Sequence, residues 1–375
     1  MTSRDFVRTL PGGSLPTTRQ LNRIHLDPLL LAALLAVIAF GLVVLFSALG
    51  QDVSAFDGQV IRMFIALAIM IVAAQLDPSF YLRWTPVLYG VGMLLLALVL
   101  AFGVTVKGSQ RWIAVPGLPR FQPSEIMKVA VPLMVAWYFN DRPLPPRFGH
   151  LLVALALIAV PAMLVAVQPD LGTAILIIAA GLAVVVLAGL LWRWIGLAGL
   201  AAAAALPGLW YVMRDYQRDR VLTLFDPERD PLGSGWNIIQ STTAIGSGGV
   251  FGKGLFEGTQ SHLDFLPEGQ TDFIIAVIAE ELGLVGVVVL LLLYLVVIAR
   301  GLYIATQARH TFGRLAVGGL TLTFFVYVFV NIAMVSGLLP VVGVPLPLVS
   351  YGGTSAITLL ASFGIVMSIH THRGW

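Results

Sequence analysis

Residues 28–49 read PLLLAALLAVIAFGLVVLFSAL, an apolar run without a charged side chain. Because an α-helix rises about 1.5 Å per residue, roughly 20 apolar residues cross the ~30 Å hydrocarbon core of a bilayer. The run is also longer than the roughly 7–15 apolar residues of a secretory signal peptide. It therefore predicts a membrane-spanning helix that is retained in the protein.

Comparable apolar runs recur throughout the chain. Hydrophobic residues make up 58% of the 375 residues and charged residues 11%, whereas about 25% of a soluble domain is charged. We predict an all-α polytopic membrane protein in which residues 1–375 form one integral membrane domain. Ten transmembrane helices are expected, near residues 28–49, 59–75, 84–103, 122–139, 149–166, 170–191, 194–211, 271–299, 313–337 and 350–370.

The basic residues predict the orientation in the membrane. An even number of spans places both termini on one side, and short cytoplasmic loops carry an excess of Lys and Arg. The opposite short loops hold Lys107, Arg111 and Arg120. We therefore predict a cytoplasmic (inner) membrane protein with both termini in the cytoplasm, a cytoplasmic tail over residues 1–27 and a large extracytoplasmic loop over residues 212–270, between spans seven and eight. The tails and short loops on the side of the termini hold Arg4, Arg8, Arg19, Arg23, Arg83, Arg142, Arg147, Arg193, Arg300, Arg309, Arg314 and Arg373.

Composition excludes several kinds of partner and site. The 22 basic residues are scattered between apolar runs, so no nucleic-acid-binding face is expected. The chain has no cysteine, which excludes disulfides, thiolate metal sites and cysteine nucleophiles. Its six histidines show no metal-ligand spacing, and the sequence carries no dinucleotide-binding fingerprint.

Polar residues gather at the predicted outer face, chiefly in residues 216–283. Asp272 follows Thr271 at the start of the eighth span, which places a carboxylate in the first helical turn at the water–lipid boundary. This acid is a candidate catalytic group; alternatively, it stabilises the helix start, with Thr271 as the N-cap. Glu280 and Glu281 lie two turns deeper, and they are either functional or polar contacts to a neighbouring helix.

Two further motifs also have both a functional and a structural interpretation. In QPSEIMK (122–128), Glu125 and Lys128 lie one helical turn apart, and they either line a site or neutralise one another. Asp170, in QPDLGTA (168–174), is expected to cap a helix in a tight outer turn.

GSGGVFGKG (246–254) is not a phosphate-binding P-loop, because Ser247 and Gly254 stand where that pattern needs Gly and then Ser or Thr. Its glycines and Lys253 form either an anion-binding nest of backbone N–H groups or a flexible turn. The residues alone thus indicate an outer-face site with carboxylates among cations, beside a membrane. Such a site suits an anionic, lipid-bound substrate.

Several separate blocks, in order along nearly the whole chain, resemble the SEDS family (shape, elongation, division and sporulation). The runs FDPERDPLGSGW and HLDFLPE look more like the elongation member of that family than the division member. The matching blocks are GSQRWI (108–113), QPSEIMK (122–128), QPDLGTA (168–174), YQRDR and DPLGSGWNIIQS (within 216–241), AIGSGGVFGKG (244–254), FLPEGQTDFIIAVIAEELG (265–283) and GLLPVVGVPLPLVSYGGTS (337–355).

The resemblance implies a peptidoglycan glycosyltransferase that polymerises lipid II and works with a class B penicillin-binding protein. The family's essential carboxylate, in the T-D-F block, corresponds to Asp272. The resemblance also implies that further residues bind substrate. These are Glu125 and Lys128 of the QPSEIMK block, Arg218 and Arg220 of YQRDR, and Gln110 and Trp112 of the family's outer loop. Lys253 is a further candidate for substrate binding, from its own charge beside the glycines of residues 246–254.

We hypothesise that Asp272 is the general base that deprotonates the 4-hydroxyl of the acceptor sugar. Lys128, Arg218, Arg220 and Lys253 would then stabilise the departing undecaprenyl pyrophosphate. No cofactor is evident, although a divalent cation, Mg²⁺ or Mn²⁺, could assist.

The main alternative function is a lipid II flippase, which should hold its polar site near the bilayer midplane, between repeated halves. The sequence shows no internal repeat, and its polar groups gather at one face. A third function, as a scaffold for wall synthesis, is compatible with the enzyme.

Overall fold

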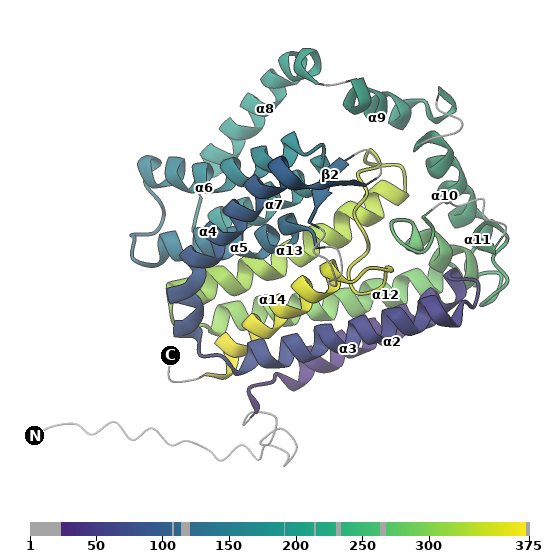
Figure 1. Cartoon of the computed structure of the whole chain (residues 1–375), viewed down its shortest axis with the longest axis horizontal. Helices are drawn as coiled ribbons and strands as arrows, with labels where there is room; N and C mark the ends of the chain where they lie inside the picture. The colour runs from purple at the N-terminus through teal and green to yellow at the C-terminus, as the bar shows by residue number, and fades with distance from the viewer. Residues whose placement is uncertain are drawn as a thin grey trace, which may run out of the picture.

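The computed structural model describes residues 24–106, 109–113, 121–190, 192–213, 215–229, 234–262 and 268–372. This part of the chain is a bundle of helices, with one small antiparallel pair of strands, β1 (Val104–Val106) and β2 (Ser109–Trp112) (Figure 1). The helices are α2 (Pro28–Ala48), α3 (Val53–Gln75), α4 (Pro78–Phe102), α5 (Pro123–Asn140), α6 (Phe148–Val167), α7 (Leu171–Leu187), α8 (Trp192–Val212), α9 (Asp215–Phe225), η2 (Pro227–Arg229), α10 (Ser234–Gly248), α11 (Thr259–His262), α12 (Ile274–Gln307), α13 (Thr311–Val335) and α14 (Thr354–Thr371).

Every apolar run predicted to span the membrane overlaps one of these helices. Among the described residues, 7 helices are long and apolar enough to cross a bilayer, namely α2, α3, α4, α6, α12, α13 and α14. Helix α7 is apolar but shorter, and α5 carries Glu125 and Lys128 in its first turns. The prediction of a helical, multi-pass membrane protein is therefore confirmed.

Three aspartates explain where helices α2, α3 and α4 begin. The carboxylates of Asp27, Asp52 and Asp77 accept hydrogen bonds from the backbone N–H groups of the first turns of α2, α3 and α4. Pro28 and Pro78 follow two of these caps, at positions where a helix does not need the missing N–H. Side-chain capping by nearby residues thus fixes where α2, α3 and α4 start.

Helix α13 lies at the centre of the bundle and packs against α5, α7 and α12, whereas α14 packs against α3 (Figure 1). At the end of the bundle that carries the start of α2, Arg300 Nη2 lies 2.6 Å from Asp27 Oδ2. Burial raises the pKa of Asp27, but hydrogen bonds from His370 and Arg300 outweigh it and hold that pKa well below its usual range. Through Asp27, Arg300 and His370, these contacts join α2, α12 and α14.

Helix α12 is broken at Gly283, where the backbone has φ 65° and ψ −162°. The glycine-rich segment 249–254 satisfies the backbone groups that the break leaves free. Lys253 N donates to Glu280 O at 3.0 Å, and Leu284 N donates to Gly249 O at 3.0 Å. Irregular backbone is tolerated at membrane depth where other protein groups complete its hydrogen bonds. We call segment 249–254 the glycine clamp.

The contacts of the glycine clamp show that both interpretations of GSGGVFGKG, an anion-binding nest and a flexible turn, are wrong. A Cβ atom on Gly252 would lie 2.1 Å from Glu281 O, so only glycine allows this close approach of two backbones. The N–H groups of Gly252, Lys253 and Gly254 all donate to backbone carbonyls. They are neither an open anion-binding nest nor a flexible turn.

Two long segments between the apolar helices complete the fold. Residues 336–353, between α13 and α14, are mostly part-buried, and their buried stretch includes Val344, Leu346 and Val349. The predicted loop 212–270 contains α9, α10 and α11, and Ser241 of α10 donates to Val335 O at 3.0 Å. Most of the HLDFLPE run lies outside the described residues.

Candidate active site

A cavity of about 530 Å³ lies where the N-terminal ends of α5, α7 and α14 meet the turn before α12 and the irregular segment 336–353. Binding pockets commonly enclose about 300–1,000 Å³, so the cavity can hold sugar or phosphate groups. Its polar and aromatic lining comprises Arg111, Trp112, Gln122, Glu125, Lys128, Asp170, Thr173, Arg220, Glu268, Thr271, Asp272, Tyr351, Thr354 and Ser355.

Asp272 lies in a turn immediately before α12 rather than in its first helical turn. The helix begins at Ile274, and the Thr271 hydroxyl donates to Glu268 Oε2 at 2.9 Å instead of capping it. The predicted Thr271 N-cap is therefore wrong. The turn is fixed by Asn331, whose Nδ2 donates to the carbonyl oxygens of Asp272 and Val344, each at 2.7 Å. The Asn331 side chain of α13 thus holds the backbone of Asp272, the residue whose carboxylate lines the cavity.

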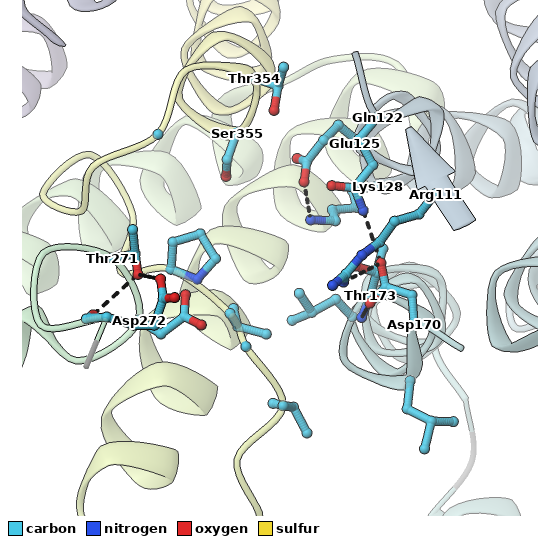
Figure 2. Close-up of a pocket in the computed structure, with 18 of the residues that line it drawn as sticks. Arg111, Gln122, Glu125, Lys128, Asp170, Thr173, Thr271, Asp272, Thr354 and Ser355 are labelled. Atoms are coloured by element: carbon cyan, nitrogen blue, oxygen red, sulfur yellow. Dashed lines mark hydrogen bonds and ion pairs between the residues drawn. The ribbon is translucent and has the colours of Figure 1, made fainter. Parts of the chain in front are cut away.

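Glu125 and Lys128 lie across the cavity from Asp272, as Figure 2 shows. Lys128 Nζ donates to Glu125 Oε1 at 2.7 Å, and both residues are 5% exposed. The Lys128 ammonium also lies 4.8 Å from the centre of the Tyr327 ring. The structure therefore combines the two sequence interpretations, because the residues neutralise one another and also line the cavity.

Asp170 caps α7, as predicted, by accepting from Thr173 N at 3.2 Å. Its other carboxylate oxygen accepts from Gln122 Nε2 at 2.9 Å and lies 3.5 Å from Arg111 Nη1 (Figure 2). The sequence predicts neither the contact of Arg111 with Asp170 nor a role for Gln122. Both residues stand in blocks that resemble the family, and this resemblance is the only feature of the sequence that could have indicated a role for them.

The remaining predicted site residues fall into three groups. Trp112 and Arg220 line the cavity. Gln110 lies on β2 opposite Thr105, but its side chain is outside the described part of the structure. Arg218 and Lys253 are not among the cavity-lining residues. Their proposed role in binding stays a prediction.

Arg218 and Lys253 make structural contacts elsewhere. Arg218 donates to the carbonyl oxygens of Trp210 and Tyr211 at 2.9 and 2.8 Å, at the end of α8. Lys253 Nζ lies 2.7 Å from Glu280 Oε1. These contacts indicate that Arg218 secures a helix end and that Lys253 secures the glycine clamp.

The two deeper glutamates of α12 also have structural partners. Glu280 is fully buried and accepts from the backbone N–H groups of Thr259 and Gln260 at 2.8 and 2.9 Å. Glu281 accepts from the Ser47 hydroxyl of α2 at 2.7 Å. The interpretation of Glu281 as a contact to a neighbouring helix is confirmed, and Glu280 anchors α11.

The cavity has two chemically different sides. Asp272 gives one side an acidic group, whereas Lys128 and Arg111 bring cations to the other, each beside a carboxylate (Figure 2). Glu268, which accepts from the Thr271 hydroxyl, adds a second acidic group next to Asp272. A base on one side can accept a proton while cations on the other stabilise developing negative charge. Within the described ranges, no group of three His, Asp or Glu side chains could hold a metal ion.

Comparison with known proteins identifies the family. A family model for cell cycle proteins of the FtsW, RodA and SpoVE type matches residues 27–374. The chain belongs to this family, the SEDS family. The SEDS chain is 57% identical to "Peptidoglycan glycosyltransferase MrdB" of Escherichia coli K12, over 94% of this chain and 95% of that protein.

Other relatives are less similar in sequence but share the fold. The chain is 36% identical to "Probable peptidoglycan glycosyltransferase FtsW" of Trichlorobacter lovleyi, over 92% of both chains. It matches the crystal structure of the Thermus thermophilus rod shape determining protein RodA with a TM-score of 0.71 and 31% identity, over 93% of this chain and 98% of that one.

A third solved structure matches with a TM-score of 0.82 and 33% identity, over 92% of this SEDS chain and 98% of the other. It is described as "Structural coordination of polymerization and crosslinking by a peptidoglycan synthase complex". The likeness to these structures extends over 92–93% of the chain.

Proposed function

We propose that this SEDS protein is a peptidoglycan glycosyltransferase that joins lipid II disaccharides into glycan strands at the outer face of the cytoplasmic membrane, for cell elongation and rod shape. The observation that carries the proposal is a single cavity that holds Asp272 opposite the Lys128 cation. The 57% identity to the peptidoglycan glycosyltransferase MrdB supports the same activity.

In the proposed reaction, the Asp272 carboxylate accepts the proton of the 4-hydroxyl on the acceptor's N-acetylglucosamine. The freed oxygen attacks the anomeric carbon of the donor and forms the β-glycosidic bond. The bond from that carbon to the pyrophosphate oxygen breaks, and undecaprenyl pyrophosphate leaves with the electron pair. Lys128 and Arg111, on the opposite side of the cavity, are suited to stabilise this leaving group.

The proposed topology has ten spans with both termini in the cytoplasm. This topology would place four parts of the chain on the outer side of the membrane: the start of α5, the start of α7, segment 212–270 and the turn before α12. The cavity formed by these ends would then open toward lipid II in the outer leaflet. Arg300 and His370, which pair with Asp27, would lie at the cytoplasmic face.

We also propose a class B penicillin-binding protein as the partner that cross-links the strands. The support is the likeness to a chain whose structure is described as a peptidoglycan synthase complex that coordinates polymerization and crosslinking. Lipid II and the surrounding membrane lipid are the other expected ligands.

The flippase alternative is less well supported. A transporter is expected to hold its polar site near the midplane. Here the lining groups come from the first turns of α5, α7 and α14, at one end of the bundle.

Purified protein incubated with fluorescent lipid II separates the two functions. The proposal predicts a ladder of glycan products on a gel, without any other enzyme. A flippase would instead move lipid II between the leaflets of proteoliposomes and give no polymer. Translocation without glycan products, in a preparation shown to be active, would contradict the proposed function.

A further inference from the structure

A second hollow, of about 350 Å³, lies between α6 and α7 and has no polar side chain in its lining. We call it the α6–α7 groove. It is lined by Leu155, Ile158, Ala159, Ala162, Met163, Ala166, Leu171, Ala174, Ile175, Ile178 and Leu182.

Small and large side chains alternate in a way that shapes this groove. Ala159, Ala162 and Ala166 recur at helical spacing on α6, and they share the lining with Ala174 of α7. The larger Met163 and Ile175 beside them are 60% and 49% exposed. The groove is therefore open on the lipid-facing surface of the bundle, where hydrocarbon surrounds an apolar span.

The groove adjoins the candidate active site. Leu171 lines both hollows, and the preceding residue, Asp170, belongs to the cavity wall beside Arg111. From Leu171 to Leu182 the groove follows α7 for about 16 Å, given a rise of roughly 1.5 Å per residue. It thus leads from the cationic side of the cavity into the depth of the membrane.

We propose that the α6–α7 groove binds the polyisoprenoid chain of the lipid-linked donor. The proposal rests on the proposed function and extends it. A donor whose pyrophosphate lies beside Arg111 and Lys128 needs an apolar path for its chain from that point into the bilayer, because hydrocarbon has no favourable place in a polar cavity. The groove supplies that path, and its position beside the cavity, with Leu171 in both linings, favours this chain over the acyl chain of a bulk phospholipid.

Two alanine substitutions on the same helix form a matched pair for the test. Ala159→Phe fills the groove, whereas Ala156→Phe adds the same bulk at another exposed position of α6, outside the lining. Both proteins are assayed for polymerisation of lipid II with the full undecaprenyl chain and of an analogue with a shortened chain.

We expect Ala159→Phe to raise the KM for full-length lipid II about 10-fold or more relative to Ala156→Phe, since a filled groove removes the van der Waals contacts of the chain with α6 and α7. The KM for the short-chain analogue should be the same in both variants. An unchanged KM for full-length lipid II would overturn the proposal and indicate a phospholipid chain or an empty groove. An equal rise for both substrates would overturn it as well, because it would point to a distorted helix pair.

A second measurement does not need turnover. A photoactivatable undecaprenyl phosphate in nanodiscs should label peptides of α6 and α7 in the wild type and in Ala156→Phe, but much less in Ala159→Phe. Equal labelling of the two variants would refute the groove as the binding site. If the wild type is labelled in this way yet makes no polymer, the proposed function fails while the lipid site stands.

Discussion

The Glu125 and Lys128 side chains form a buried pair in the cavity wall, so removing either one has two consequences. It takes away a group that faces the substrate, and it leaves its partner buried without a counter-charge, which costs about 3–5 kcal/mol. A single substitution therefore cannot separate a catalytic role from a structural one. A double substitution can.

We predict that Lys128→Met lowers both the thermal midpoint and the turnover at saturating lipid II. Adding Glu125→Gln removes the unpaired carboxylate and should restore the thermal midpoint, whereas turnover should stay low because the cation is still missing. Thermal unfolding and product gels on the three proteins measure the two effects. Recovery of turnover in the double variant would mean that Lys128 serves only to neutralise Glu125.

At the level of single residues, the sequence located part of the cavity and could not locate the rest. Asp272, Glu125 and Lys128 stand in distinctive blocks, and all three line the cavity. Lys253 stands in an equally distinctive block, yet it pairs with Glu280. Chemical type and motif do not tell which way a side chain points once the chain has folded.

The elements of the fold were more predictable than its residues, because hydrophobic length is a strong signal. Helix α3 begins at Val53 and α4 at Pro78, several residues before the predicted runs at 59 and 84, since polar first turns interrupt the apolar pattern. The break in α12 had no such signal. It depends on Gly283 meeting the glycine clamp, a contact between segments separated in the chain.

The glycine clamp predicts a sharp difference between two glycines of one motif. In Gly252→Ala, the new Cβ would meet Glu281 O at 2.1 Å, and φ of +79° is unfavourable for a residue with a side chain. The left-handed conformation alone costs about 1–2 kcal/mol. Gly246→Ala places its Cβ in open space and serves as the control.

We expect Gly252→Ala to lower the thermal midpoint clearly. Gly246→Ala should change the free energy of unfolding by no more than about 0.5 kcal/mol, as surface substitutions usually do, and should leave the midpoint nearly unchanged. Thermal unfolding of the purified proteins in detergent measures both. Equal midpoints would show that the clamp does not support α12.

On the scale of the whole molecule, the fold brings distant segments to one end of the bundle. The cavity combines β2, the starts of α5 and α7, the turn before α12 and the start of α14. Hydropathy predicts the spans but not their order in space, so this convergence was not accessible from the sequence pattern. The family-like blocks indicated it indirectly, because several of them lie at those same segments.

The proposed orientation predicts opposite labelling at two exposed positions of this cysteine-free chain. A cysteine at Asp215, whose side chain is 97% exposed at the start of α9, should react with an impermeant thiol reagent added outside spheroplasts. A cysteine at Thr306, near the end of α12, should react only after the membrane is opened. The reverse pattern would place the cavity in the cytoplasm and would remove its access to lipid II in the outer leaflet.

The most direct measurement compares glycan synthesis by Asp272→Asn and Asp215→Asn. Asp272→Asn keeps the size of the side chain and removes the base in the cavity, whereas Asp215→Asn changes an exposed acid outside it. With purified, equally stable proteins and labelled lipid II, we predict no polymer from Asp272→Asn and wild-type polymer from Asp215→Asn. Near-wild-type polymer from Asp272→Asn would contradict the role of Asp272 as the catalytic base.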